Sequence, residues 1–447
     1  MSEIKVPWGN GELEFSLPEK WNLIQQAEPK LLSAEKDWML RLAASINQPV
    51  AGEPLHQRLK RVKVNDGRVS IIVEDITRHS PLVDILDVLM REISYCNFPT
   101  DKIEFVIASG MHPPMTAEEV REKLGPVAEK VAWRCNPWHD ENQYVTVGKI
   151  DGKPFLIDRQ VAMSELRIIV SSVSPHLQAG FGGGYKMFFP GCCEISSIRQ
   201  LHRFGIKRSG MNQMVGLDST RNHMRAAIDA AGSLVDKYYG ETFSIQYILD
   251  GKDLPAFIAA GEPAATHQMV TKHCAVACGI LLEQPADILI TNAYPRDYDL
   301  WQCFKAIPNT CWAARPGGVV ICLAHCEAGL NGMQVPDWFK YLSPGVMRKF
   351  IRLLGPETIT SMVNRLVANI AGDSLWFIRL ATRILYRNHL VMVSPALANA
   401  GVKFPGLAIF ETPKEAFAYA RKQLGKGPQR VSIYSAGGIS YPVDMRK

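Results

Sequence analysis

The chain has 447 residues, of which 50 are lysine or arginine and 44 are aspartate or glutamate, so its formal net charge is +6. This length is typical of two or three domains, at roughly 100 to 200 residues per domain. The near balance of charge and the lack of a long basic run exclude a nucleic-acid-binding stripe and a polybasic membrane anchor. No apolar segment reaches the roughly 18 residues of a spanning helix, and no signal-peptide pattern is present. We therefore expect a cytoplasmic protein with no membrane or nucleic-acid partner.

The first half of the chain alternates between short apolar runs and helical patterns. Three runs read as buried strands, VSIIVEDIT (69–77), IEFVIASG (103–110) and LRIIVSSVSP (166–175). Helices are predicted at 116–124, where Thr and Glu form a capping box, and at 194–204. Such alternation is typical of βαβ units and a parallel sheet.

A second series of strands predicts a second α/β domain. Its runs are DILITNAYP (287–295), GGVVICLAH (317–325), NHLVMVSPA (388–396) and GLAIFE (406–411). The segment between the two series, 221–285, is predicted to be mainly helical. The tail RVSIYSAGGISYPV (430–443) reads as a hairpin-like pair of strands that could join either domain.

These patterns predict two Rossmann-like α/β domains with mainly parallel sheets and an active-site crevice between them. Residues 1–282 would form an N-terminal cofactor-binding and catalytic domain. Residues 283–428 would form a C-terminal domain that contributes to substrate binding, and the tail, 429–447, is expected to return to the N-terminal domain.

Polar side chains follow each of the first three strands, where open α/β sheets bind their ligands. Asp75, Thr77 and Arg78 follow the first strand, His112 the second and His176 the third. A guanidinium binds carboxylate or phosphate through two hydrogen bonds, and a loop histidine can act as a general acid or base. Taken singly, each has an ordinary alternative, an Asp/Thr turn with a solvated arginine or a surface histidine. Two histidines at parallel strand ends could, however, face one reaction centre from opposite sides.

The stretch HLQAGFGGGYK (176–186) is rich in glycine, which allows a backbone to approach a ligand closely. It is not a Walker P-loop, because Lys186 is followed by Met187 and the GxxxxGK spacing is missing. It also lacks the GxGxxG fingerprint of dinucleotide binding. Lys186 is therefore interpreted as a desolvated nucleophile or a covalent attachment point, with an ordinary surface lysine as the alternative.

Two further features lie downstream of this stretch. Cys192 and Cys193 are adjacent, and we interpret them as core thiols rather than nucleophiles. His202 shares a helical face with Ile195 and Ile198. It is therefore either a core histidine or a metal ligand that these apolar neighbours would shield.

Read together, these residues resemble the nickel-pincer lactate racemase family of 2-hydroxyacid racemases and epimerases. The resemblance rests on DITR, SGMHPP, SPHLQAGFGGGYK with the following PG, and His202. In the second domain, Gln302 and Lys305 match the family's QxxK pattern, and Trp376 stands seven residues before an Arg-Ile-Leu run. The motifs occur in the expected order from Asp75 to Leu385.

The resemblance implies a nickel-pincer nucleotide, a pyridinium mononucleotide that holds nickel through sulfur, carbon and sulfur. It would be attached covalently at Lys186, with His202 as the protein's nickel ligand and Asp75, Thr77 and Arg78 lining the cofactor pocket. Separate cofactor-biosynthesis proteins would be required as partners.

The implied reaction is racemisation or epimerisation of a 2-hydroxycarboxylate. Hydride leaves Cα for the cofactor, a planar 2-oxo acid forms, and hydride returns to its other face, with His112 and His176 as the acid/base pair. The substrate-binding residues would be Arg78, Gln302, Lys305, Trp301 and Trp376. Trp301 stands where lactate racemase has tyrosine, so the resemblance does not single out lactate among 2-hydroxy acids.

Two other functions remain open from the sequence. The first is an NAD-dependent 2-hydroxyacid oxidoreductase, which the missing dinucleotide fingerprint disfavours. The second is a non-catalytic ligand-binding protein on the same scaffold.

Overall fold

The computed structural model describes residues 3–331, 341, 343–366 and 375–444. The chain divides into two compact units. The N-terminal unit comprises 31–210 and 217–277, and the C-terminal unit comprises 1–30, 211–216 and 278–447. Within the described residues, none of the helices combines the length and the apolarity needed to cross a membrane.

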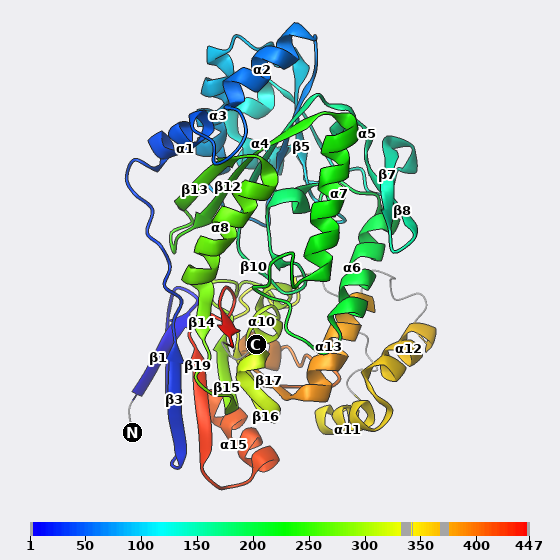
Figure 1. The fold of residues 1–447 in the computed structure, drawn as a ribbon. Coiled ribbons are helices and arrows are strands. Elements are labelled where there is room, and N and C mark those ends of the chain that lie inside the picture. The colour runs from blue at the N-terminus through cyan, green and yellow to red at the C-terminus, as the bar shows by residue number, and fades with distance from the viewer. Residues whose placement is uncertain (1–2, 332–340, 342, 367–374, 445–447) are drawn as a thin grey trace. The chain divides into compact units, whose positions relative to one another are not determined.

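The N-terminal unit is built on a six-stranded sheet (Figure 1). Its strands, in spatial order, are β13 (Pro255–Gly261), β12 (Glu241–Leu249), β9 (Leu166–Ser172), β4 (Val69–Val73), β5 (Ile103–Ile107) and β6 (Ala132–Cys135). All neighbours are parallel except β12 and β13. Strand β4 therefore lies between β9 and β5, and the carboxyl ends of these three predicted strands are adjacent.

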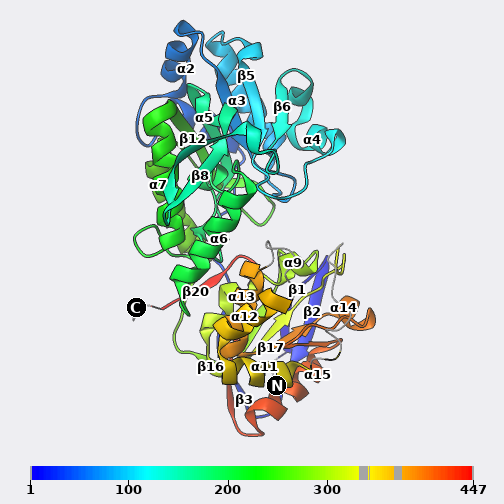
Figure 2. The same cartoon turned by 90° about the vertical axis from the view of Figure 1, so that its right-hand side faces the viewer.

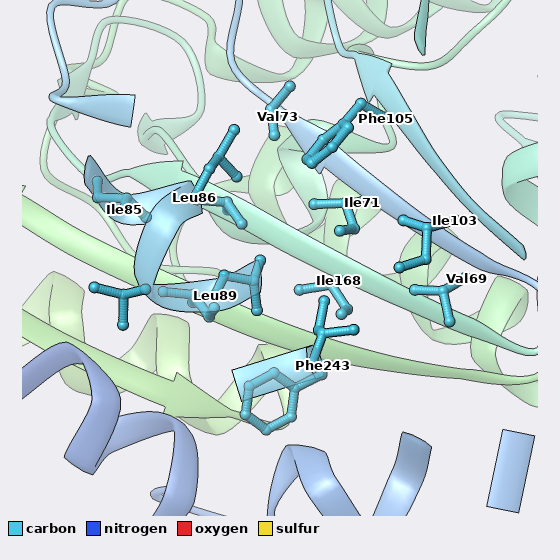
Figure 3. Close-up of a cluster of buried hydrophobic side chains, with 14 of the residues drawn as sticks. Val69, Ile71, Val73, Ile85, Leu86, Leu89, Ile103, Phe105, Ile168 and Phe243 are labelled. Carbon is cyan, nitrogen blue, oxygen red and sulfur yellow. The ribbon is translucent and has the colours of Figure 1, made fainter. Parts of the chain in front are cut away.

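Helices pack on both faces of this sheet because successive strand residues point to opposite sides. One face packs against α1 (Trp38–Asn47), α2 (Leu55–Val64), α3 (Leu82–Tyr95) and α4 (Ala117–Leu124). Figure 3 shows this core, in which Ile71, Phe105 and Ile168 of the strands lie with Leu86 and Leu89 of α3. The other face packs against α5 (Arg159–Met163), α6 (Ile195–Ser209) and α7 (His223–Tyr239).

Smaller elements complete the unit. They are the hairpin of β7 (Tyr144–Ile150) and β8 (Lys153–Asp158), the short pair β10 (Pro175–His176) and β11 (Gly180–Phe181), and the helix α8 (Pro263–Cys278). The capping box predicted for the helix at 116–124 is confirmed, because Thr116 and Glu119 exchange both hydrogen bonds at the start of α4.

The C-terminal unit has a second six-stranded sheet, in which every neighbouring pair is parallel. Its order is β18 (Leu407–Phe410), β17 (His389–Val393), β16 (Ala314–Leu323), β15 (Ala286–Asn292), β19 (Gln429–Tyr434) and β3 (Trp21–Ala27). One face packs against α15 (Pro413–Leu424) and the hairpin of β1 (Glu3–Trp8) and β2 (Gly11–Ser16).

The other face of this sheet is covered by α9 (Leu300–Cys303), α10 (Ala306–Thr310), α11 (Pro344–Leu354), α12 (Pro356–Leu366) and α13 (Leu375–Arg387). Helices α11, α12 and α13 pack against one another (Figure 2). The remaining elements are α14 (Pro395–Asn399) and the parallel pair of β14 (Gly279–Leu281) and β20 (Tyr441–Val443). The predicted α/β fold with mainly parallel sheets is confirmed.

Three expectations from the sequence are corrected. The tail does not return to the N-terminal unit, because β19 lies between β15 and β3 and buries its apolar residues in the C-terminal sheet. Its strands do not form a hairpin, since β20 pairs with β14 instead. Residues 1–30 also belong to the C-terminal unit, where β3 closes the edge beside β19.

The segment 221–285 contains the two strands β12 and β13 as well as the helices α7 and α8. In β12 the polar residues Thr242, Ser244 and Gln246 alternate with the apolar residues Phe243, Ile245 and Tyr247, and all six are buried. Such alternation is a strand pattern, so the prediction of a mainly helical segment was wrong at this point.

Replacing Ile168 by alanine should destabilise the N-terminal unit by about 2 to 5 kcal/mol, because the side chain is completely buried and its removal leaves a cavity. Urea unfolding followed by circular dichroism measures the change. Val64→Ala is the matched control, since Val64 is 86% exposed and its truncation should alter stability by less than about 0.5 kcal/mol. Equal losses in the two variants would contradict the assignment of this core.

Candidate active site

A buried carboxylate joins three strand ends at the edge where the predicted site residues lie. Glu74, directly after β4, accepts hydrogen bonds from the backbone N–H of Ser172 on β9 (2.7 Å) and from the hydroxyl of the same residue. Its other oxygen accepts from Ser80 (2.8 Å) and from Tyr247 on β12 (3.2 Å). Burial and the nearby Glu74 raise the pKa of Tyr247 well above its ordinary value, so the phenol remains a donor. The carboxyl ends of β4, β9 and β12 are thereby held in register.

His112 is paired with Asp75 across two of these strand ends. Its ring nitrogen Nδ1 lies 2.6 Å from Asp75 Oδ2, while its side chain is 56% exposed and that of Asp75 only 9%. Burial opposes ionisation of Asp75, but the hydrogen bond and charge of His112, the Thr77 hydroxyl and Arg78 outweigh it and lower its pKa to about 2. The backbone of His112 is fixed by its N–H to Ser109 (3.0 Å) and by the Trp138 indole, which donates to its carbonyl (3.2 Å). The pair is therefore an oriented imidazole on an ionised carboxylate.

His176 is oriented by its own backbone. Its Nδ1 accepts hydrogen bonds from the N–H groups of Gln178 (3.2 Å) and Ala179 (3.0 Å). These residues form the tight connection between β10 and β11, in which His176 is paired with Gly180. Both predicted histidines therefore have defined ring orientations, and the strands that precede them flank β4.

The glycine stretch is shaped by two buried side chains from α7 and α8. Arg225 donates to the carbonyls of Phe181 (3.3 Å) and Gly183 (3.2 Å), and His267 Nε2 lies 2.9 Å from the carbonyl of Gly182. Burial, and then Arg225, lower the pKa of His267 well below its ordinary value, so the ring is neutral. Gly184 has φ +61°, and a Cβ there would lie 2.8 Å from the His267 ring. Glycine is required at that position by both conformation and space.

Lys186 lies in the short 3-10 helix Gly184–Met187 that follows these glycines. Its pKa is lowered to about 7, first by burial and then by the charges of Arg78 and Arg225, with Asp75 opposing the shift. Because the charges of Arg78 and Asp75 act on Lys186, the end of β4 lies near the glycine stretch. A lysine in this state is largely neutral at slightly alkaline pH and can act as a nucleophile.

The loop that carries His112 is tied to the segment that follows Lys186. Gly110 N–H donates to the carbonyl of Gly191 (2.9 Å), and Asn136 donates to the carbonyls of Gly110 and Cys193 (both 2.9 Å). These hydrogen bonds place the loop of His112 beside the segment that follows Lys186.

His202 lies in the middle of α6 and is half-buried. In the part of the chain that the structure describes, no cluster of three or more His, Cys, Asp or Glu side chains is arranged to hold a metal ion. Cys192 and Cys193 are fully buried, and burial raises the pKa of both thiols. Their interpretation as core thiols is confirmed.

The predicted substrate residues of the second domain lie in the C-terminal unit. Lys305 donates to the Gln302 side chain (2.6 Å), and Asp299 caps the short helix α9 that carries Gln302. Trp301, on the same helix, is 39% exposed. Trp376 is on α13, but its side chain lies outside the described residues.

Several residues that support the site were not predicted from the sequence. Glu74, Arg225 and His267 act through hydrogen bonds to distant segments, and Lys123 on α4 donates to the carbonyl of Arg78. What distinguishes these polar side chains is that they are buried, and burial is visible only in the folded chain.

Comparisons with known proteins agree with this architecture. The lactate racemase N-terminal domain family matches residues 8–213, and the lactate racemase C-terminal domain family matches residues 281–441. A lactate racemase of Thermoanaerobacterium thermosaccharolyticum is 26% identical over 434 residues, covering 94% of each chain. One from Lactiplantibacillus plantarum is 25% identical over 393 residues, covering 85% of each.

Two solved structures share the fold. That of the T. thermosaccharolyticum lactate racemase apoprotein has a TM-score of 0.80 at 21% identity, covering 99% of this chain and all of the other. A Thermotoga maritima protein has a TM-score of 0.59 at 14% identity, covering 86% and 96%.

The two matching family domains and the full-length relatives identify an isomerase of the racemase class. The chain belongs to the lactate racemase family, as its motifs indicated.

The amine of Lys186 should react with acetic anhydride with a half-maximal rate near pH 7, because only the neutral amine is nucleophilic and its pKa is lowered to about 7. Peptide mapping by mass spectrometry across a pH series measures this. Arg78→Gln removes one of the two positive charges that lower the pKa, so its midpoint should move upward. A midpoint above pH 10 in the unaltered protein would contradict a desolvated lysine.

Proposed function

We propose that this protein is a racemase or epimerase of a 2-hydroxy acid that uses a nickel-pincer nucleotide attached to Lys186. The observation that carries the proposal is the adjacency of three strand ends. Strand β4, with Asp75 to Arg78, lies between β5 and β9, which lead to His112 and His176. Strands two positions apart in a sheet are separated by roughly 10 Å, which leaves space for a small substrate between two histidines.

The residues present fit the proposed cofactor. Lys186 has the lowered pKa needed to form an amide-type bond, and Arg78 lies close enough to influence it and to bind a phosphate. His202 supplies one imidazole, and a single protein ligand suffices where the nucleotide itself supplies the other donors. When bound, such a cofactor would accept and return the hydride of Cα.

The chain's own residues would then bind the substrate and move its hydroxyl proton. Arg78, Lys305 and Gln302 would hold the carboxylate and neighbouring oxygens, and Trp301 and Trp376 would shape the pocket wall. His112 and His176 would exchange protons with the substrate oxygen on its two sides. Hydride removal avoids a carbanion beside an ionised carboxylate, which explains why this chemistry uses a cofactor and not a side-chain base alone.

We also propose that the protein is cytoplasmic and that it depends on cofactor-biosynthesis proteins. With those proteins present, the unaltered chain should gain a cofactor-sized mass and bind nickel, whereas Lys186→Ala should gain neither. Intact mass spectrometry and nickel analysis measure the two quantities. A wild-type chain that never acquires either would exclude the proposed cofactor.

Cofactor-loaded protein should racemise or epimerise at least one member of a panel of chiral 2-hydroxy acids, as read by chiral chromatography. His112→Ala and His176→Ala should each reduce this activity by roughly 10²- to 10⁴-fold, the usual contribution of a general acid or base. Full activity in either variant would contradict the pairing of the two histidines. Activity that depends instead on added NAD would favour the oxidoreductase alternative.

A further inference from the structure

The hydrogen bonds around His112 fix which of its ring nitrogens carries the proton. Asp75 is ionised and can only accept hydrogen bonds. Its Oδ1 already accepts from the backbone N–H of Thr77 (3.1 Å) and from the Thr77 hydroxyl (2.5 Å), while Oδ2 faces His112 Nδ1 at 2.6 Å. Nδ1 must therefore be the donor. In the neutral ring this leaves the lone pair on Nε2, the nitrogen that can take up a proton.

The surroundings of His176 require the opposite arrangement. Its Nδ1 faces two backbone N–H groups, those of Gln178 at 3.2 Å and Ala179 at 3.0 Å. Backbone N–H groups can only donate, so Nδ1 is the acceptor and carries no proton. In the neutral ring the proton is then on Nε2. A proton added to Nδ1 would be directed at two other protons and would break both hydrogen bonds.

We propose that the two histidines are held in opposite tautomers and are therefore not equivalent. His112 is poised as a base through Nε2, with Asp75 as its positioning residue. His176 is held as an Nε2–H hydrogen-bond donor and exchanges protons only after the turn 176–179 releases its Nδ1. This inference rests on the proposed function for its chemical meaning, but the tautomers themselves are properties of the protein alone.

Because the two rings are held in opposite tautomers, the two directions of the reaction are not equivalent. When the substrate hydroxyl faces His112, its O–H bond breaks, a new N–H bond forms at Nε2, and Asp75 stabilises the resulting imidazolium. The Cα–H bond breaks with its electron pair, and the proposed cofactor, when bound, would be the acceptor of this hydride. When the hydroxyl faces His176 instead, the ring cannot accept the proton until Nδ1 has become the protonated nitrogen. One enantiomer is then oxidised directly, whereas oxidation of the other requires the turn 176–179 to open first.

The tautomers can be measured in the full-length protein with ¹⁵N-labelled histidine. Long-range ¹H–¹⁵N correlation spectra at pH 8 should show His112 protonated at Nδ1 and His176 protonated at Nε2. The variants His112→Gln and His176→Gln assign the two sets of signals by their disappearance. The same tautomer in both rings would overturn the proposal, whether or not the protein carries cofactor or has activity.

The variant Asp75→Asn tests whether Asp75 sets the tautomer of His112. The two Thr77 donors should keep the amide oxygen on their side, so the amide N–H₂ would face His112 and force its proton onto Nε2. The His112 signals should therefore change to the other tautomer, while those of His176 stay as they are. Circular dichroism confirms that the variant is folded. An unchanged His112 tautomer in the folded variant would show that Asp75 does not position this ring.

Single-turnover experiments on loaded enzyme test the direction. Each enantiomer is mixed with excess enzyme, quenched in acid, and its 2-oxo acid is trapped with a hydrazine. One enantiomer should be oxidised at least tenfold faster than the other. His112→Gln should lose this fast oxidation. Equal rates for the two enantiomers would contradict the inequivalence, whereas failure of the enzyme to load would contradict only the proposed cofactor.

Discussion

The hydrogen bonds of Glu74 are the interaction on which the site depends. A carboxylate is costly to bury unless its oxygens are satisfied, and here donors from three different segments satisfy them. Because Ser172 and Tyr247 belong to the neighbouring strands β9 and β12, the same bonds fix how far each strand extends beyond the sheet. Asp75 follows Glu74 directly, so the partner of His112 is placed by the residue that joins the strands.

Further hydrogen bonds orient the backbone of the glycine stretch and the ring of His176. Arg225 and His267 hold the carbonyls of the glycine stretch, and two backbone N–H groups hold the His176 ring. The positive charge of Arg225 also contributes to the lowered pKa of Lys186. One arginine thus shapes the loop and changes the chemistry of the lysine within it. This combination explains how a glycine-rich segment can hold a lysine whose pKa is lowered.

The sequence predicted the strands that lead to the site but not all of those that complete the sheets. Strand β4 is mostly apolar and was predicted, whereas β12, in which polar and apolar residues alternate, lies in a segment that was predicted to be mainly helical. The tail strand β19 was recognisable as a strand, but its partners were not. The pairing of a strand depends on which other strand lies beside it in the folded chain. Here β19 pairs with β15, which is about 140 residues away in the chain.

The sequence by itself determined the identity of the chemical groups, since His112, His176, Lys186, Asp75 and Arg78 follow strands whose apolar patterns are local. It also indicated the family, because ordered motifs do not require coordinates. Only the tertiary structure decided what each group can do. The ring of His176 is held by the backbone of its own turn. The protonated nitrogen of His112 and the lowered pKa of Lys186 depend on an acceptor and on charges that segments distant in the chain bring close. Those contacts follow from strand order and burial, which no local pattern encodes.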